Sequence, residues 1–110
     1  MSGAKRPRIM VSMTNALGTY QSEQEGERID CFVIHRRPGV LAPLHGWTMT
    51  HEPTGYILAF FVYLRNARRA VKRLQRLDID WLTLTVDRWN SSEFQAARNA
   101  VWGALEDLAE

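Results

Sequence analysis

The sequence predicts a single α+β domain in which an antiparallel sheet of about four or five strands carries two helices on one face. Three observations predict this class. The 110 residues are enough for one hydrophobic core and too few for two. Most strand-like runs follow one another with turn residues between them, and two segments have the three- and four-residue apolar spacing of helices. We expect residues 1–8 to form a flexible basic arm and residues 9–110 to form the domain.

The predicted sheet begins with two short apolar runs. Residues 9–13 and 29–35 are rich in β-branched, aromatic and other apolar side chains, which favour strands. Residues 18–27 between them are polar and contain a glycine near each end, so we expect an exposed loop there. Residues 37–46 contain proline and glycine near both ends, and we expect a second loop.

Residues 47–62 predict a β-hairpin. In its first strand, residues 47–51, large side chains alternate with threonine. This alternation places on one face Trp47, Met49 and His51. In the turn that follows, Pro53 presets the first central residue and Gly55 supplies the left-handed conformation that a bulged hairpin needs. Residues 56–62 are uniformly apolar, so we expect this strand at the centre of the sheet beneath the helices.

The C-terminal part of the chain predicts one more strand and a helix. Residues 81–86 alternate in the manner of a half-buried strand, and residues 87–90 then turn the chain. Ser92 and Gln95 have the spacing of a capping box, which marks the start of a helix. The apolar stripe of this helix continues to the end of the chain and contains Phe94, Ala97, Val101, Ala104, Leu105 and Leu108.

A basic helix predicted over residues 64–77 is the most distinctive segment. Its apolar stripe consists of Ala67, Ala70, Val71, Leu74 and Leu77. The rest of its surface carries basic side chains with no acidic residue among them, namely Arg65, Arg68, Arg69, Lys72, Arg73 and Arg76. A positive field of this density predicts an anionic partner, and guanidinium groups suit both phosphates and carboxylates. The alternative interpretation is a solvated surface whose arginines pair with the acids of residues 23–27 or of the C-terminus.

Composition argues against several classes of protein. Apolar residues make up 45% and charged residues 24%, and the longest apolar run, residues 56–64, is far shorter than the roughly 20 residues of a membrane span. The N-terminal sequence lacks the apolar region of a secretory signal, so we expect a cytoplasmic protein without a membrane partner. Its single cysteine, Cys31, agrees with a reducing compartment and is expected to be a small buried hydrophobe.

Other residues are weaker candidates for chemistry. Of the tryptophans we expect Trp89 to be exposed, because it lies in a polar turn, where it could stack on a base beside the basic helix. Three histidines, one of them next to Glu52, invite a metal or acid–base site: His35, His45 and His51. Their spacing matches no helical ligand pair, and we expect ordinary surface or rim histidines. The sequence predicts no metal site, no cofactor and no catalytic group, and therefore no enzyme.

One stretch of sequence resembles a known group of proteins. Residues 46–55 (Gly-Trp-Thr-Met-Thr-His-Glu-Pro-Thr-Gly) are followed by a strand, an Ala/Arg helix and Leu-Asp-Ile-Asp-Trp at residues 77–81. This pattern resembles small uncharacterised proteins encoded by bacteriophages and prophages, over roughly the middle third of the chain. The resemblance implies a mobile-element origin and a bacterial host cytoplasm, and a few such phage proteins act by docking on host defence machinery. It transfers no catalytic residue.

Two functions follow from the sequence. The first is a non-enzymatic module that binds nucleic acid through the basic helix, residues 65–76, together with Trp89. The second is a phage-encoded docking protein that inhibits a host defence complex, of the CRISPR type or another nuclease, through an acidic protein surface. Salt distinguishes them, because phosphate binding weakens steeply with ionic strength. The sequence leaves open a homodimer and a role for the basic arm.

Overall fold

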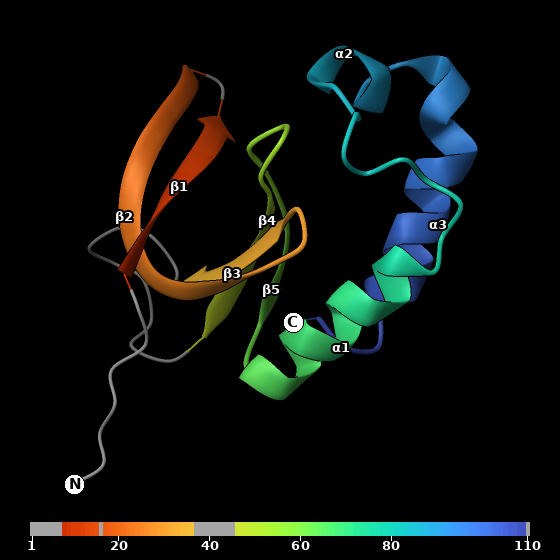
Figure 1. Cartoon of the computed structure of the whole chain (residues 1–110). Helices are drawn as coiled ribbons and strands as arrows, with labels where there is room; N and C mark the ends of the chain where they lie inside the picture. The colour runs from red at the N-terminus through yellow and green to blue at the C-terminus, as the bar shows by residue number, and fades with distance from the viewer. Residues whose placement is uncertain (1–7, 16, 37–45, 110) are drawn as a thin grey trace, which may run out of the picture.

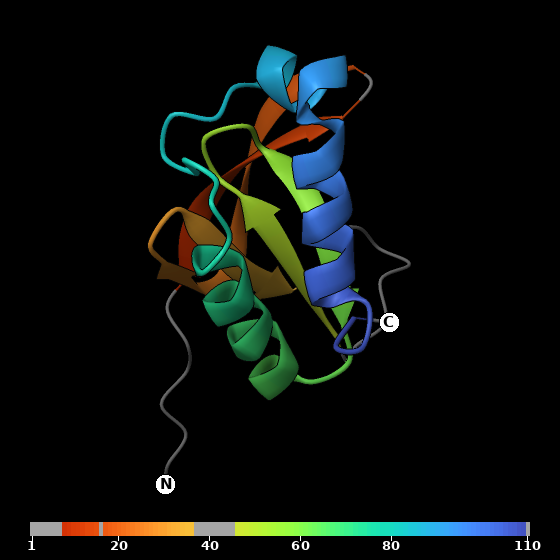
Figure 2. The same cartoon turned by 90° about the vertical axis from the view of Figure 1, so that its right-hand side faces the viewer.

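A computed structural model describes residues 8–15, 17–36 and 46–109, and within these ranges the chain forms a five-stranded sheet and two long helices. The strands are β1 (Arg8–Asn15), β2 (Gly18–Ile29), β3 (Phe32–Arg36), β4 (Trp47–His51) and β5 (Tyr56–Phe61). The helical elements are α1 (Leu64–Gln75), the short α2 (Val86–Trp89), the 3₁₀ turn η1 (Ser92–Phe94) and α3 (Gln95–Leu105). The strands lie in chain order and each is antiparallel to its neighbour. Helices α1 and α3 cover one face (Figures 1 and 2), which confirms the predicted α+β architecture.

Two predicted segments, one a flexible arm and the other a loop, lie mostly outside the described residues. These are the basic arm and the loop before β4, of which residues 1–7 and 37–45 are not described. Arg8, the last residue of the predicted arm, begins β1 instead. Its Nε atom donates to Oε1 of Glu23 on β2 at 3.0 Å.

β1 and β2 form a long two-stranded ribbon, so the prediction of a loop over residues 18–27 is wrong. The pairing runs from Asn15 opposite Gly18 to Arg8 opposite Glu25. Polar side chains suit β2 because much of the strand faces solvent. Pairing with β1 decides its conformation, and local polarity carries no signal of that pairing.

At Gly26 the β2 strand leaves β1 and begins to pair with β3, opposite His35. The two backbones approach closely here. A Cβ atom on residue 26 would lie 2.3 Å from the carbonyl oxygen of Ile34, so only glycine fits.

The ribbon crosses the face of the sheet that the helices leave uncovered (Figure 1). Val11 and Met13 of β1 bury themselves there against Val33, in a small second core. The end of β1 is also fastened to the β4–β5 turn, because the Thr14 N–H donates to the Gly55 carbonyl at 2.7 Å. The sheet is therefore covered on both faces.

The main core lies between the sheet and the helices. The alternation predicted for β4 is confirmed, as are the apolar stripes of both long helices. The buried side chains of this core include Phe32, Ile34, Trp47, Met49, Phe61, Ala67, Ala70, Val71, Leu74, Trp81, Phe94, Val101, Leu105 and Leu108.

The predicted turn over residues 52–55 is confirmed. Gly55 has a φ of 76° and its N–H donates to the His51 carbonyl at 2.8 Å. A side chain at this position would meet β1, because a Cβ atom there would lie 2.4 Å from Thr14 Oγ1. Both the left-handed backbone and the close approach require glycine.

Two strand predictions need correction. β5 lies at the edge of the sheet and not at its centre, because it pairs only with β4 in the described sheet. Its apolar character comes from the helices, against which Leu58 and Phe61 are buried, while Phe60 stays 40% exposed. The strand predicted over residues 29–35 is broken at Asp30, whose φ of 58° makes a tight turn before β3. Cys31 in that turn is buried, as expected.

The strand predicted over residues 81–86 is wrong. The chain turns there instead, and the indole N–H of Trp81 donates to the Leu74 carbonyl at 2.9 Å. The Trp81 and Leu84 side chains are both buried, three residues apart. Burying the large Trp81 ring with its N–H satisfied favours this compact path over an extended strand.

The segment before α3 also differs from the prediction. The predicted turn over residues 87–90 is largely the short helix α2, whose first turn is capped by Thr85 Oγ1 accepting from the Arg88 N–H at 3.2 Å. The capping box does not form, because the N-cap residue of α3 is Phe94 and the Gln95 Oε1 atom accepts from the Arg98 guanidinium at 2.8 Å. The helix itself forms over the predicted apolar stripe, but it ends at Leu105, before Leu108 of that stripe.

Candidate anion-binding surface

The basic residues of α1 surround a buried apolar side. Ala67, Ala70, Val71 and Leu74 pack into the main core. At about 100° per residue, four basic side chains fall within about 60° of one another on the opposite side of the helix. We call this row the crest, and it consists of Arg65, Arg69 and Lys72 of α1 and of Arg76, the C-cap residue, whose backbone is still helical. With a rise of about 1.5 Å per residue, the crest is about 17 Å long.

The two remaining basic residues of the helix lie on its flanks and are engaged with acids. On one flank the Arg68 guanidinium donates to both carboxylate oxygens of Glu27 on β2, at 2.6 and 3.1 Å. On the other flank Arg73 donates to both oxygens of Asp107, at 2.5 and 3.2 Å, and to the Ala104 carbonyl at 3.2 Å. These hydrogen bonds raise the pKa of both arginines, and the bond from Arg73 lowers the pKa of Asp107. The alternative interpretation of the sequence is therefore right for Arg68 and Arg73.

The crest differs from the flanks. Within the described ranges, no side-chain hydrogen bond or ion pair joins Arg69, Lys72 or Arg76 to another residue. The Arg65 guanidinium lies over the ring of Tyr63, 4.4 Å from its centroid. The first turn of α1 contains no acidic residue and Tyr63 provides no side-chain cap, so the positive end of the helix dipole adds to the field of the crest.

Trp89 does not belong to this surface, and its predicted exposure is wrong. The side chain is only 8% exposed and packs on Phe94 and Trp102, with ring centroids 5.6 and 5.8 Å away. Arg98 closes the same region by donating to the carbonyl groups of Trp89 and Ser91. The polar neighbours of Trp89 in sequence gave no sign of this burial, because the ring is covered by α3.

The aromatic residue that does lie at the crest is Tyr63, which sequence reasoning missed. It immediately precedes α1, its side chain is 52% exposed, and Arg65 packs on its ring. An aromatic residue two positions before the first basic residue of an amphipathic helix was the available signal.

The histidines are structural, so the expectation of surface or rim positions is wrong for the two that are described. His51 Nε2 donates to the Trp81 carbonyl at 2.7 Å, which leaves Nδ1 as the acceptor facing Thr54 Oγ1 at 2.9 Å. His35 Nδ1 donates to the Arg36 carbonyl at 2.8 Å. Burial lowers the pKa of both imidazoles, so both are neutral at pH 7. His45 lies outside the described residues.

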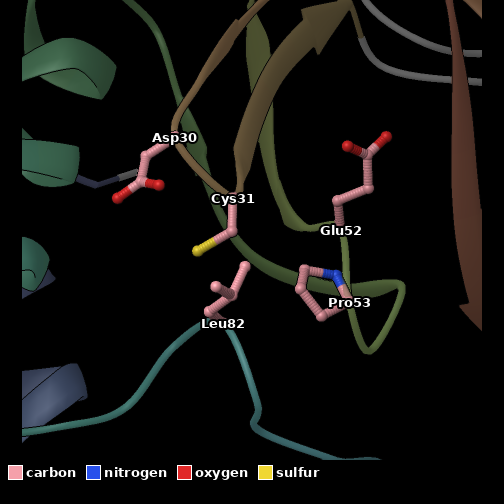
Figure 3. Close-up of a pocket in the computed structure, with 5 residues that line it drawn as sticks. All are labelled: Asp30, Cys31, Glu52, Pro53 and Leu82. Carbon is pink, nitrogen blue, oxygen red and sulfur yellow. The ribbon is translucent and has the colours of Figure 1, made fainter.

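A hollow of about 290 Å³ lies where the β2–β3 and β4–β5 turns meet the segment after α1 (Figure 3). Its lining residues are Asp30, Cys31, Glu52, Pro53 and Leu82. Burial raises the pKa of the Cys31 thiol to about 11, so it is protonated and a poor nucleophile. Glu52 is held by Arg28 through hydrogen bonds of 2.8 and 2.9 Å, and its carboxylate points away from the thiol in Figure 3. The hollow therefore lacks an activated nucleophile–base pair among its lining residues.

Comparison of the chain with protein-family models, with curated proteins and with solved structures finds no match. In the part of the chain that the structure describes, no helix is long and apolar enough to cross a membrane. The same part contains no group of three or more histidine, cysteine, aspartate or glutamate residues placed to hold a metal ion. The crest is therefore the feature on which a functional proposal can be built.

Proposed function

We propose that the protein is a non-enzymatic module that binds nucleic acid through the crest of α1. One observation carries the proposal: four cations stand in a row on a well-anchored helix, and no described acid pairs with them. Surface cations that already pair with acids have their charge neutralised locally. The charge of the crest is available to a partner.

The shape of the crest suits a phosphate backbone. Its members are three or four residues apart, which places them about 4.5 to 6 Å apart along the helix axis. A row of cations at this spacing can contact successive phosphates of one strand, and each contact releases counterions. Four contacts give a slope of about −3 to −4 for log K against log salt concentration.

The flank pairs orient the crest towards solvent. Arg68 ties one side of α1 to β2, and Arg73 ties the other side to the end of α3. Exposed ion pairs of this kind contribute little free energy individually. Together with the buried apolar side, however, they fix the rotation of the helix, so that a partner meets a row of cations that is already arranged.

A double charge reversal with a matched control tests the proposal. Arg69→Glu with Lys72→Glu changes two crest residues, whereas Arg8→Glu with Arg88→Glu makes the same charge change at exposed positions of β1 and α2. Binding of a fluorescent oligonucleotide is measured by anisotropy at low salt. We expect the crest reversal to weaken binding on the order of 100-fold and the control reversal to weaken it far less.

Two results would contradict nucleic-acid binding through the crest. The first is equal loss in both variants, which would mean that net charge and not the crest attracts the oligonucleotide. The second is an absence of wild-type binding at low salt. If the crest reversal then still abolished capture of an acidic host protein complex, the crest would be the docking surface of a phage-encoded inhibitor, the alternative that the sequence raised.

A further inference from the structure

We infer that the crest binds single-stranded nucleic acid, with one unstacked base packed on Tyr63 beside Arg65. This inference rests on the proposed function and names its substrate class. The observation that carries it is the position of Tyr63, an exposed aromatic ring directly at one end of a row of cations.

The backbone at Tyr63 is held in place by hydrogen bonds, so the ring is attached to an ordered position. The residue is the N-cap of α1, and its carbonyl accepts from the N–H groups of Asn66 and Ala67 at 3.1 and 3.3 Å. The Arg65 guanidinium packs over the ring, with its Cζ atom 4.4 Å from the ring centroid. A platform that is already ordered loses little conformational entropy when a base packs on it.

The ring also has room for a ligand. More than half of the Tyr63 side chain is exposed although Arg65 covers part of it, and its neighbour Val62 is equally exposed and uncharged. A flat base can therefore pack on Tyr63 while its phosphates follow the crest. Proteins that bind single strands combine these two elements, a basic track and an aromatic platform.

A duplex cannot use this platform as it stands. Its bases are stacked on one another, so a side chain that approaches from the backbone meets phosphate and sugar first. A single strand offers an unstacked base at no cost in base pairing. The crest alone would bind both forms, and Tyr63 makes the difference between them.

The experiment compares three probes of equal length, about 12 nucleotides: a thymidine strand, a strand of the same phosphates without bases, and a duplex. Binding is measured at one low salt concentration for the wild type and for four variants. Tyr63→Ala and Tyr63→Leu remove the ring, and Tyr63→Phe keeps it. Tyr20→Ala is the control, because Tyr20 is 42% exposed but lies near the β1–β2 turn, opposite Met13 of β1.

We expect the wild type to bind the thymidine strand about 5- to 150-fold more tightly than the base-free strand, the range that stacking of one base supplies. This preference disappears in Tyr63→Ala and Tyr63→Leu and remains in Tyr63→Phe and Tyr20→Ala. Circular dichroism verifies that each variant is folded, and Tyr63→Leu keeps an apolar side chain at the N-cap in case alanine perturbs the helix.

Different failures have different meanings. If the wild type binds all three probes equally, or if its preference for bases survives loss of the Tyr63 ring, the stacking inference is wrong and the proposed function stands. If the wild type prefers the duplex, the substrate class is wrong. If no probe binds at low salt, the proposed function and this inference both fail.

Discussion

The flanks and the crest of α1 contain the same kind of residue on the same helix, in different surroundings. Arg68 and Arg73 each donate two hydrogen bonds to a carboxylate, on β2 and after α3 respectively. The crest lies between them, directed away from both acids, and has no described acidic partner. The position of a side chain around the helix axis, and not its residue type, decides whether a basic residue supports the fold or can bind a partner. Of the six basic residues in this segment of sequence, four therefore belong to the candidate site.

The largest loss of stability is expected from a change in α3, near the end that holds Arg73 on one flank of α1. Leu105 is buried in the main core two residues before Asp107, the partner of Arg73. We expect Leu105→Ala to lower the free energy of unfolding by about 2 to 5 kcal/mol, because it leaves a cavity against the sheet. Chemical denaturation measures this loss. The exposed neighbour Glu106 is the control, and Glu106→Ala should change stability by at most about 0.5 kcal/mol. Equal midpoints for the two variants would mean that α3 does not hold the core.

A substitution in the β4–β5 turn should lower stability without changing the affinity for an oligonucleotide. Gly55 has a positive φ and touches Thr14, so Gly55→Val should destabilise the fold by about 1 to 3 kcal/mol. The control is Gly103→Ala on α3, where a Cβ atom meets no neighbour within 4 Å and helix propensity favours alanine by up to about 1 kcal/mol. Thermal melts compare the two. Oligonucleotide affinity of the folded Gly55→Val protein should equal that of the wild type, and a parallel loss of affinity would show that the crest depends on the distant turn.

The stability of the fold should also depend on pH through two buried histidines. The pKa of His35 and His51 is lowered from 6.5 by burial, so the unfolded chain binds more protons below that value than the folded chain. Their contribution is fully present above pH 6.5 and is lost as the pH falls towards the lower folded-state pKa, by up to about 1.4 kcal/mol per pH unit for each histidine. Urea titrations from pH 8 to pH 5 measure the change. A free energy of unfolding that stays constant down to pH 5 in His51→Gln but falls in the wild type would assign the effect to His51 alone, and a constant wild type would contradict the burial of both.

Parts of this molecule that depend on local periodicity were predictable, and parts that depend on distant pairing were not. The stripes of α1 and α3 and the turn at Gly55 follow from residues close in sequence, and the structure confirms them. β2 was assigned to a loop because its side chains are polar, although pairing with β1 decides its conformation. The sequence raised pairing of the arginines with residues 23–27 but did not indicate which arginine pairs, since it is the β2 strand that places Glu27 beside Arg68. The predicted exposure of Trp89 was wrong for a related reason, because α3 covers its ring.

The most direct test of the division between flanks and crest is the salt dependence of oligonucleotide binding in two single variants. Arg68→Gln and Arg69→Gln remove the same charge from adjacent positions, one on a flank and one on the crest. We expect Arg69→Gln to reduce the slope of log K against log salt by about 0.7 to 0.9, because one phosphate contact is lost, and Arg68→Gln to leave the slope unchanged. Equal reductions in both variants would contradict the division, because an arginine held by Glu27 would then contact phosphate as readily as one on the crest.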